Sequence, residues 1–439
     1  MNSKLIFIQL NEINFELVYK YINSANKKKF TNLRYLKKNF KNFETFAEDK
    51  YENIEPWIQW ASVHLGKNYK SHQIFRLGDI VNHPEMKQIF EKIEEKGFKV
   101  GAISPMNSKN DLKNPAFFIP DPWTDTASDN SEFSKRISLL LKQSVNDNSS
   151  GKLSFSSIVT IFEIIFKTFD FKNTPFLIRL IFSSIFKPWK KSLVLDYLIH
   201  NLYLYFLKKK TVNFSSVFFN AGAHIQHHYF YNSKHIKNFP KNPHWYIAGT
   251  FDPIEDMLEI YDKIIGDYIK LSKNSSPVLI ATGLRQIPYD KIQFYYRLKN
   301  HSLFLNKIGI KFSKILPRMT RDFEIHFVTD KNLINAKKIL ENIFSKKNNI
   351  KIFNEIEIRS KSLFVTLTYP IEIKKEDYLI INKNLQLNFL NEVSFVAIKN
   401  GKHHQKGYAF CSPNINFKIP KNSIHVSKIN KLIMSNFDL

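Results

Sequence analysis

The sequence predicts an α/β fold: a three-layer α/β/α core with a helical cap insertion and a small α+β insertion. Two observations predict this class. Short apolar runs of the length of buried strands recur along the chain, and amphipathic helical segments alternate with them. This alternation is typical of a largely parallel sheet covered by helices. The 439 residues allow for about two to three units of ordinary domain size.

The first part of the chain, residues 1–145, follows this α/β alternation. Its apolar start predicts a buried strand at 4–10, and the helical pattern at 86–96 stops at Gly97, where the next strand begins. The other expected elements are helices around 15–22 and 33–36 and a strand at 98–103.

Residues 146–211 differ in character, with three aromatic-rich helical segments at 155–169, 175–186 and 193–207. Charged residues interrupt each segment before it reaches the roughly 18 to 20 uncharged apolar residues of a membrane span. We expect a helical cap insertion here. A basic, aromatic surface that contacts lipid is the alternative.

The α/β alternation returns after residue 212. A strand at 217–219, a long helix at 253–271 and a strand at 277–280 complete the core, together with tail strands at 394–398 and 407–410. Between them, residues 291–395 show a β-α-β-β order that predicts a small α+β insertion. The expected core is therefore residues 1–145, 212–290 and 396–439.

Composition excludes several classes of protein. The single cysteine, Cys411, excludes an internal disulfide framework and a cysteine-based zinc cluster. Sequence patterns of dinucleotide-binding, P-loop, zincin and serine-hydrolase sites are absent. The formal net charge of +26 comes mostly from dispersed Lys, which makes nucleic acid an unfavoured partner. It reflects either a coding bias or an anionic partner, such as a phosphorylated substrate or an acidic membrane surface.

The first residues show no export signal, because the apolar run is too short and no small-residue cleavage site follows it. We expect a cytoplasmic protein, with the inner face of a membrane as the alternative location.

Polar side chains collect where predicted strands end, which is where parallel α/β sheets place their functional residues. Five such places occur. They are Asn11-Glu12, residues 55–72, residues 220–228, residues 281–286 and residues 402–404.

The order of short motifs at these places resembles the alkaline phosphatase superfamily, in particular its type I phosphodiesterase and nucleotide pyrophosphatase branch. The motifs are the strand that ends at Asn11-Glu12, FTNLRYL at 30–36, EPWIQWASVHLG at 55–66, SHQI at 71–74, NAGAH at 220–224, YDKIIG at 261–266, TGL at 282–284 and the late pair His403-His404.

The resemblance implies two divalent metals held by Asp and His, and a Thr or Ser nucleophile. In this sequence Asn11 and Asn220 stand at two of the Asp positions, and Pro56 stands at the nucleophile. Amide oxygens do not neutralise a metal pair, so we expect at most one divalent metal (Zn, Mn or Fe). The candidate ligands are His224, His228, His403, His404 and Asn220, with either Glu12 or Glu55 as a carboxylate ligand. The alternative is that these histidines are hydrogen-bonded in a polar cleft.

The remaining candidate residues would act on the substrate. Glu55, His64 and Glu12 are the candidate catalytic residues, although Glu55 before Pro56 is also typical of a helix start. Arg318 and Arg321 are spaced to clamp an anion, or to form a structural pair with Asp322. The candidate substrate-binding residues are Trp57, Trp60, Arg318, Arg321 and Asn11.

We therefore expect hydrolysis or transfer at a phosphate or sulfate ester, on a nucleotide- or glycan-linked substrate. The alternative is a catalytically inactive member of the fold that binds an anionic glycan, a nucleotide or a partner protein. The sequence leaves open the substrate, the metal, the oligomeric state and which of His403 and His404 faces the site.

Overall fold

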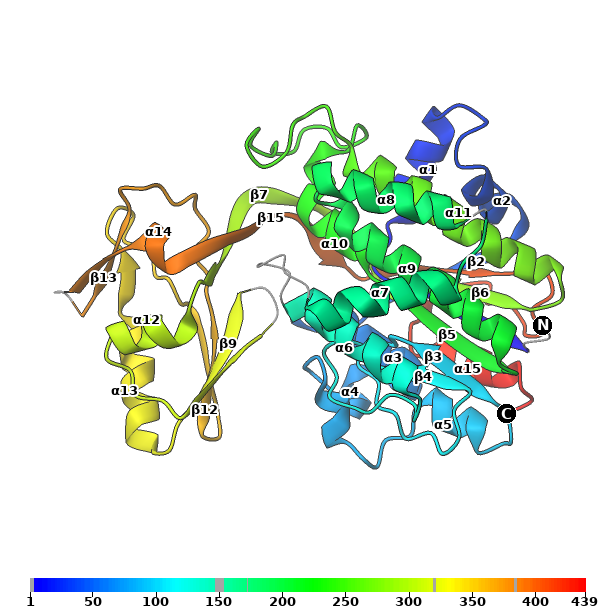
Figure 1. The fold of residues 1–439 in the computed structure, drawn as a ribbon, viewed down its shortest axis with the longest axis horizontal. Coiled ribbons are helices and arrows are strands. Elements are labelled where there is room, and N and C mark those ends of the chain that lie inside the picture. Colours follow the sequence, from blue (N-terminus) through cyan, green and yellow to red (C-terminus); the bar gives the residue numbers. More distant parts are fainter. Residues whose placement is uncertain (1–3, 147–153, 172, 319–320, 383–384) are drawn as a thin grey trace. The chain divides into compact units, whose positions relative to one another are not determined.

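The chain folds into two compact units in the structure, a computed structural model that describes all residues except 1–3, 147–153, 172, 319–320 and 383–384 (Figure 1). The larger unit consists of Met1–Pro288 and Gly401–Leu439, and the smaller of Tyr289–Asn400. The predicted division with a separate cap is finer than this and stays a prediction. Residues 147–153 and 172 of that cap lie outside the described residues.

The larger unit is built on an eight-stranded sheet in the order β17-β2-β16-β6-β1-β5-β3-β4. Neighbours from β6 to β4 run parallel, and β16 is antiparallel to both β6 and β2. The central sheet is mostly parallel, so the predicted α/β class is confirmed. The strands are β1 (Leu5–Leu10), β2 (Lys41–Phe46), β3 (Val100–Ile103), β4 (Phe117–Ile119), β5 (Phe214–Phe219), β6 (Val278–Ala281), β16 (Lys406–Cys411) and β17 (Ile424–His425).

Side chains of the central strands alternate between two hydrophobic cores, one on each face of the sheet. In β1, Ile6 and Ile8 belong to one core, and Leu5 and Phe7 belong to the other. Helices cover both faces, which gives three layers. The first face carries α1 (Phe15–Ser24), α2 (Thr31–Asn39), α6 (Glu132–Asn146), α7 (Phe155–Lys167), α8 (Thr174–Phe186), α9 (Lys190–Lys209), α10 (Ala221–Tyr229) and α11 (Pro253–Lys273); the second carries α3 (Pro56–Leu65), α5 (Ile89–Glu94) and α15 (Lys428–Ser435), and α4 (Tyr69–His72) follows α3.

Local capping chemistry explains where several helices begin. The Asn14 side chain accepts a hydrogen bond from the amide of Leu17 at the start of α1. The Asp252 side chain accepts from the amide of Glu255, and a proline occupies the first turn of α11. Helix α3 ends at Gly66, whose φ of 73° suits glycine.

The smaller unit contains a four-stranded sheet in the order β11-β12-β9-β8 and a three-stranded sheet in the order β10-β13-β14. The chain enters it within strand β7 and leaves it within strand β15. The elements are β7 (Arg285–Leu298), α12 (His301–Lys307), β8 (Lys314–Pro317), β9 (Asp322–His326), α13 (Asp330–Glu341), β10 (Ile343–Ser345), β11 (Glu355–Arg359), β12 (Ser362–Thr366), β13 (Tyr378–Ile381), β14 (Leu385–Asn388), α14 (Phe389–Glu392) and β15 (Val393–His404).

Candidate metal centre

Two amide side chains meet at the carboxyl edge of the central sheet. Asn11 follows β1 and Asn220 follows the neighbouring strand β5, and Asn11 Nδ2 donates to Asn220 Oδ1 at 2.8 Å. The same nitrogen donates to Glu12 Oε1 at 3.0 Å, while Asn11 Oδ1 accepts from Trp60 Nε1 at 2.8 Å. The Asn11 amide therefore uses both of its protons and its oxygen within the protein.

Glu12 is held in an uncommon backbone conformation beside this amide pair. Its φ is 61°, in the left-handed region that most residues avoid. The Glu12 amide donates to Thr282 O at 3.1 Å, and its carbonyl accepts from Gln226 Nε2 at 3.0 Å and from the Gln286 amide at 3.2 Å. Strained residues of this kind persist where the surrounding structure fixes them, often at functional sites.

Three ligand-type atoms from separate chain segments converge at this edge. Glu12 Oε2 lies 3.2 Å from His227 Nε2 on α10 and 3.2 Å from His403 Nε2 on β15, and the two nitrogens are 3.3 Å apart. Among the residues that the structure describes, this is the one group of three or more His, Cys, Asp or Glu with this convergence. We call it the Glu12-His227-His403 cluster.

The donor set and its dimensions fit a single divalent metal. Ligands placed tetrahedrally at about 2.0–2.1 Å from zinc are about 3.3–3.4 Å from one another, which is close to the observed separations. Two imidazole nitrogens and one carboxylate oxygen also suit manganese and iron. Three protein ligands leave a coordination position for substrate or water, as in catalytic zinc sites.

Further side chains orient the three ligands. Glu55 Oε2 lies 3.3 Å from His403 Nδ1, and Gln286 Nε2 donates to Glu12 Oε2 at 2.6 Å. An imidazole whose Nδ1–H faces a carboxylate presents its Nε2 lone pair on the opposite side, toward the cluster. Glu55 is the residue before α3, so the start of that helix positions it.

The two histidines keep Glu12 ionised although it is buried. Burial favours the protonated carboxyl, but the charges and hydrogen bonds of His403 and His227 outweigh burial and hold the pKa of Glu12 far below its usual range. A negative charge with almost no solvent exposure is therefore present at neutral pH, and such a charge favours a bound cation.

Helix α10, which carries His227, is fixed by close packing and by a buried acid. A Cβ at Gly222 would lie 2.9 Å from the ring of Tyr261, so the helix approaches more closely than a side chain allows. Asp196 accepts from the Ala221 amide at 2.9 Å and from Tyr261 Oη at 2.7 Å. Burial raises the pKa of Asp196 to about 7.

Of the predicted histidine ligands, His403 belongs to the cluster and the others have different contacts. The rings of His224 and His228 pack together with centroids 4.8 Å apart, and burial and the nearby His227 lower the pKa of His224 to about 4. His404 Nδ1 accepts from the Lys406 amide at 3.1 Å. Metal binding by His224, His228, His404 and Asn220 stays a prediction.

The candidates on α3 have contacts in the protein interior. His64 lies 2.8 Å from Ser108 Oγ through Nδ1 and 3.1 Å from Gln9 Nε2 through Nε2, and burial lowers the pKa of His64 to about 3. Trp60 is fully buried and donates to Asn11, while Trp57 donates to a backbone carbonyl. These contacts suit packing and positioning, and the predicted roles in catalysis and substrate binding are untested.

The two candidate arginines belong to the smaller unit. Arg318 Nη2 lies 2.6 Å from Glu324 Oε2, and the Arg321 guanidinium lies 4.5 Å from the centre of the Tyr295 ring. Met319 and Thr320 between them lie outside the described residues. An anion clamp by this pair stays a prediction.

Sequence reasoning missed His227 as a ligand and the roles of Gln226 and Gln286. His227 falls in a stretch with three histidines, and the spacing alone does not say which face of the helix turns toward β15. Gln286 is the last residue of the polar stretch at 281–286, and its position after β6 is the sequence signal that marks it.

No protein-family model matches the sequence, and no curated protein is similar to it. Solved structures do match. Murine ectonucleotide pyrophosphatase/phosphodiesterase 5 is 12% identical over 100% of this chain and 95% of that chain, with a TM-score of 0.40. A TAB5 alkaline phosphatase variant is 9% identical over 100% and 98%, with a TM-score of 0.41. Phosphonoacetate hydrolase from Sinorhizobium meliloti 1021 is 9% identical over 98% and 95%, with a TM-score of 0.38.

The first two proteins are, by name, a nucleotide pyrophosphatase/phosphodiesterase and an alkaline phosphatase, and these are the names in the resemblance that the motif order suggests. At these identities and TM-scores the similarity says nothing about the chemistry of this chain, which has to come from its own side chains.

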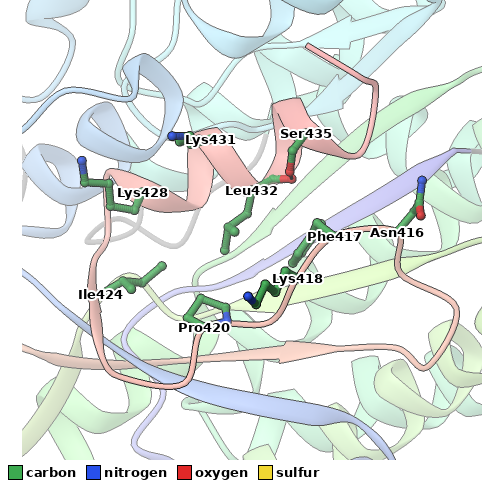
Figure 2. A pocket seen from close by; sticks show the side chains of 9 residues that line it. All are labelled: Asn416, Phe417, Lys418, Pro420, Ile424, Lys428, Lys431, Leu432 and Ser435. Atoms are coloured by element: carbon green, nitrogen blue, oxygen red, sulfur yellow. Dashed lines mark hydrogen bonds between the residues drawn. The ribbon is translucent and has the colours of Figure 1, made fainter.

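A separate hollow of about 450 Å³ lies beside α15 (Figure 2). Three lysines, Lys418, Lys428 and Lys431, line it together with apolar side chains such as Phe417 and Leu432. None of its lining residues belongs to the Glu12-His227-His403 cluster.

Among the described residues, no helix is long and apolar enough to cross a membrane.

Proposed function

We propose that this protein is a metal-dependent enzyme with one metal, which hydrolyses or transfers a phosphate or sulfate ester. The observation that carries the proposal is the convergence of Glu12 Oε2, His227 Nε2 and His403 Nε2 at separations of 3.2 to 3.3 Å. The motif order that resembles the alkaline phosphatase superfamily supports the choice of ester. The net charge of +26 supports an anionic substrate. A nucleotide- or glycan-linked ester is the substrate class that we propose.

A divalent metal held by this cluster would supply Lewis-acid polarisation of an ester oxygen. The protein's own contribution is to orient the ligands. Glu55 fixes the His403 ring, while Gln286 and Asn11 each donate to one oxygen of Glu12. The ligand atoms are therefore held in place before any metal binds, which lowers the entropic cost of binding.

One metal suits this edge better than two. Where the resemblance implies carboxylates, Asn11 and Asn220 are hydrogen-bonded to each other and carry no charge. Two adjacent dications would repel each other strongly without those carboxylates.

A second candidate function is binding of an anionic glycan, a nucleotide or a partner protein without turnover. The neutral Asn11-Asn220 pair favours this candidate, because it removes charge that the resemblance assigns to catalysis. Pro56, at the position of the nucleophile, points in the same direction.

Metal content measured by plasma mass spectrometry, together with turnover of para-nitrophenyl phosphate, bis-para-nitrophenyl phosphate and para-nitrophenyl sulfate, tests the proposal. Wild type, His227→Ala and the matched control His244→Ala, at an exposed histidine outside the cluster, would each be stripped with chelator and reloaded with Zn, Mn or Fe. We expect about one metal per chain and metal-dependent turnover in wild type and His244→Ala, with both lost in His227→Ala. Metal binding without turnover of any ester favours the second candidate, and a wild type that binds no metal contradicts the proposal.

A further inference from the structure

Helix α7 exposes most of its large apolar side chains, while two of its three buried residues carry small hydroxyl groups. Its buried residues are Ser157, Thr160 and Ile164. A helix that faces water normally has the opposite arrangement, with its apolar stripe toward the core. The outward stripe consists of Phe155, Ile158, Val159, Phe162 and Phe166.

Helix α8 is apolar on its outward side as well as on its inward side. Both helices pack on α9, on the first face of the central sheet (Figure 1). The buried residues of α8 are Thr174, Leu177, Leu180 and Ser184, whereas Phe186 at its end is 84% exposed. We define the phenylalanine face as the exposed apolar residues of α7, α8 and their link: Phe155, Ile158, Val159, Phe162, Phe166, Phe169, Phe171, Ile178, Phe182, Ile185 and Phe186.

The phenylalanine face is too large for an ordinary water-exposed surface. Seven of its members are phenylalanines that are each more than half exposed. At about 200 Å² for each aromatic side chain, they present on the order of 1,000 Å² of apolar surface. The largest apolar patch of a soluble monomer is typically about 300–600 Å², so the apolar surface exposed on these two helices and their link favours a partner.

Basic side chains accompany the phenylalanine face. Arg179, Lys167 and Lys191 are exposed and Lys187 is half-buried, all on or beside α7 and α8. The acid on α7, Glu163, lies 2.6 Å from Arg136 and 3.8 Å from Lys167, so its charge is balanced. An apolar stripe with a basic border is the pattern of helices that lie in the interface of an anionic membrane.

The charge of the whole chain favours lipid over a second copy of the protein. Two chains of net charge +26 would bring their basic borders together, whereas an anionic lipid surface attracts them. Helices α7 and α8 have 13 residues each, about 20 Å, which is too short to cross a bilayer. They are long enough to lie in the plane of its surface.

We propose that α7 and α8 dock this protein onto an anionic lipid bilayer. The phenylalanine face enters the boundary between headgroups and acyl chains, and the exposed Arg179 and Lys191 contact the anionic headgroups. This proposal goes beyond the ester chemistry and does not depend on the metal centre.

Vesicle sedimentation with a surface variant tests the proposal. The variant carries Phe162→Ser, Phe166→Ser, Phe182→Ser and Phe186→Ser, and the matched control carries Leu303→Ser, Val328→Ser, Ile334→Ser and Ile358→Ser, which are also exposed apolar positions. Vesicles of phosphatidylcholine with about 30% phosphatidylglycerol are compared with pure phosphatidylcholine at low and high salt.

We expect wild type and control to sediment with the anionic vesicles, more weakly at high salt, and the variant to bind at least about tenfold more weakly. A wild type that binds no anionic vesicles, or a variant that binds as well as wild type, overturns the proposal. A wild-type dimer that the variant converts to monomer, without vesicle binding, also overturns it and assigns the face to a second copy.

A fluorescent label provides a test that does not require four substitutions. Cys411, the one native cysteine, is buried, and burial raises the pKa of its thiol to about 12, so it resists labelling. An environment-sensitive fluorophore on Phe182→Cys should shift to the blue when anionic vesicles are added, whereas the same label on Ile334→Cys should not. Equal shifts, or none at position 182, overturn the proposal.

Discussion

Two neighbouring groups at the carboxyl edge of the central sheet use their polar atoms in opposite ways. In the Asn11-Asn220 pair, Asn11 Nδ2 donates a hydrogen bond to Asn220 Oδ1 at 2.8 Å, and both side chains are neutral. In the Glu12-His227-His403 cluster, a carboxylate oxygen and two imidazole nitrogens, all atoms of a kind that binds metals, lie 3.2 to 3.3 Å from one another. A satisfied amide pair needs no ligand, whereas a carboxylate and two imidazoles that converge form a ligand set for a cation. Amide and carboxylate positions a few ångströms apart therefore predict different occupants, and we place one metal at this edge of the sheet.

The largest expected effect comes from removing the charge of the cluster. Glu12→Gln keeps the shape of the side chain but replaces the carboxylate, so zinc affinity measured by titration calorimetry should fall by more than about 100-fold. The matched variant Glu16→Gln, which changes a carboxylate paired with Arg285 and Lys406 outside the cluster, should leave zinc affinity unchanged. Equal losses of zinc affinity in the two variants would contradict a site at the cluster, because the effect would then come from the overall charge.

The dependence of the free energy of unfolding on pH should show that His64, which lies outside the cluster, is buried in its neutral form. Burial holds the pKa of His64 at about 3, below its usual 6.5, so the unfolded chain binds a proton in this window that the folded chain does not. The stability from neutral His64 is present above about pH 6.5 and is lost as pH falls toward about 3. Between about pH 6 and about pH 4, the free energy of unfolding of wild type should fall by about 1.4 kcal/mol more per pH unit than that of His64→Gln. Parallel pH profiles in urea unfolding would contradict the neutral, buried state of His64.

Charging the amide pair should cost stability. Asn11→Asp removes the donors to Glu12 Oε1 and Asn220 Oδ1 and places a second carboxylate beside Glu12. We expect a loss of about 2 kcal/mol in the free energy of unfolding at neutral pH with chelator present. Asn39→Asp, at a helix end where the side chain donates to the Tyr35 carbonyl, serves as the control for loss of a single donor. An Asn11→Asp protein as stable as wild type would show that the amide pair is not satisfied in the way described.

The smallest expected effect concerns the orientation of His403. Glu55→Gln keeps a hydrogen-bonding group near Nδ1 but removes the charge that holds the ring. Zinc affinity should fall about tenfold, since partners of metal-bound histidines contribute about 10- to 100-fold. A loss as large as that of Glu12→Gln would instead make Glu55 a direct ligand and revise the cluster.

Local signals predicted most of the fold. The strand expected at 4–10 is β1 (Leu5–Leu10), and the helix expected at 253–271 is α11 (Pro253–Lys273), because an apolar run and an N-terminal Asp-Pro signal are both read within the segment itself. The helix expected at 86–96 is shorter, with α5 covering Ile89–Glu94. Strand β7 is not predicted, and β15 is predicted only in part, at 394–398. The two strands pair with each other across a long stretch of sequence, and β7 contains a proline.

The cluster was only partly predictable. Asn11, Glu12 and His403 follow from their places at strand ends, but the direction of the Glu12 side chain depends on its left-handed backbone, which no neighbouring glycine indicates. His227 depends on how α10 is rotated, and that rotation is set by the packing of Gly222 against Tyr261 from a distant helix. Distant contacts of this kind are outside the reach of periodicity and motif spacing.

Anomalous X-ray diffraction from crystals grown with zinc would locate a metal at the Glu12-His227-His403 cluster. We expect one strong zinc peak per chain, bonded to Glu12 Oε2, His227 Nε2 and His403 Nε2, and none between Asn11 and Asn220. A zinc ion held by His224 and His228 instead, a second ion at the amide pair, or no peak at the cluster would contradict the claim.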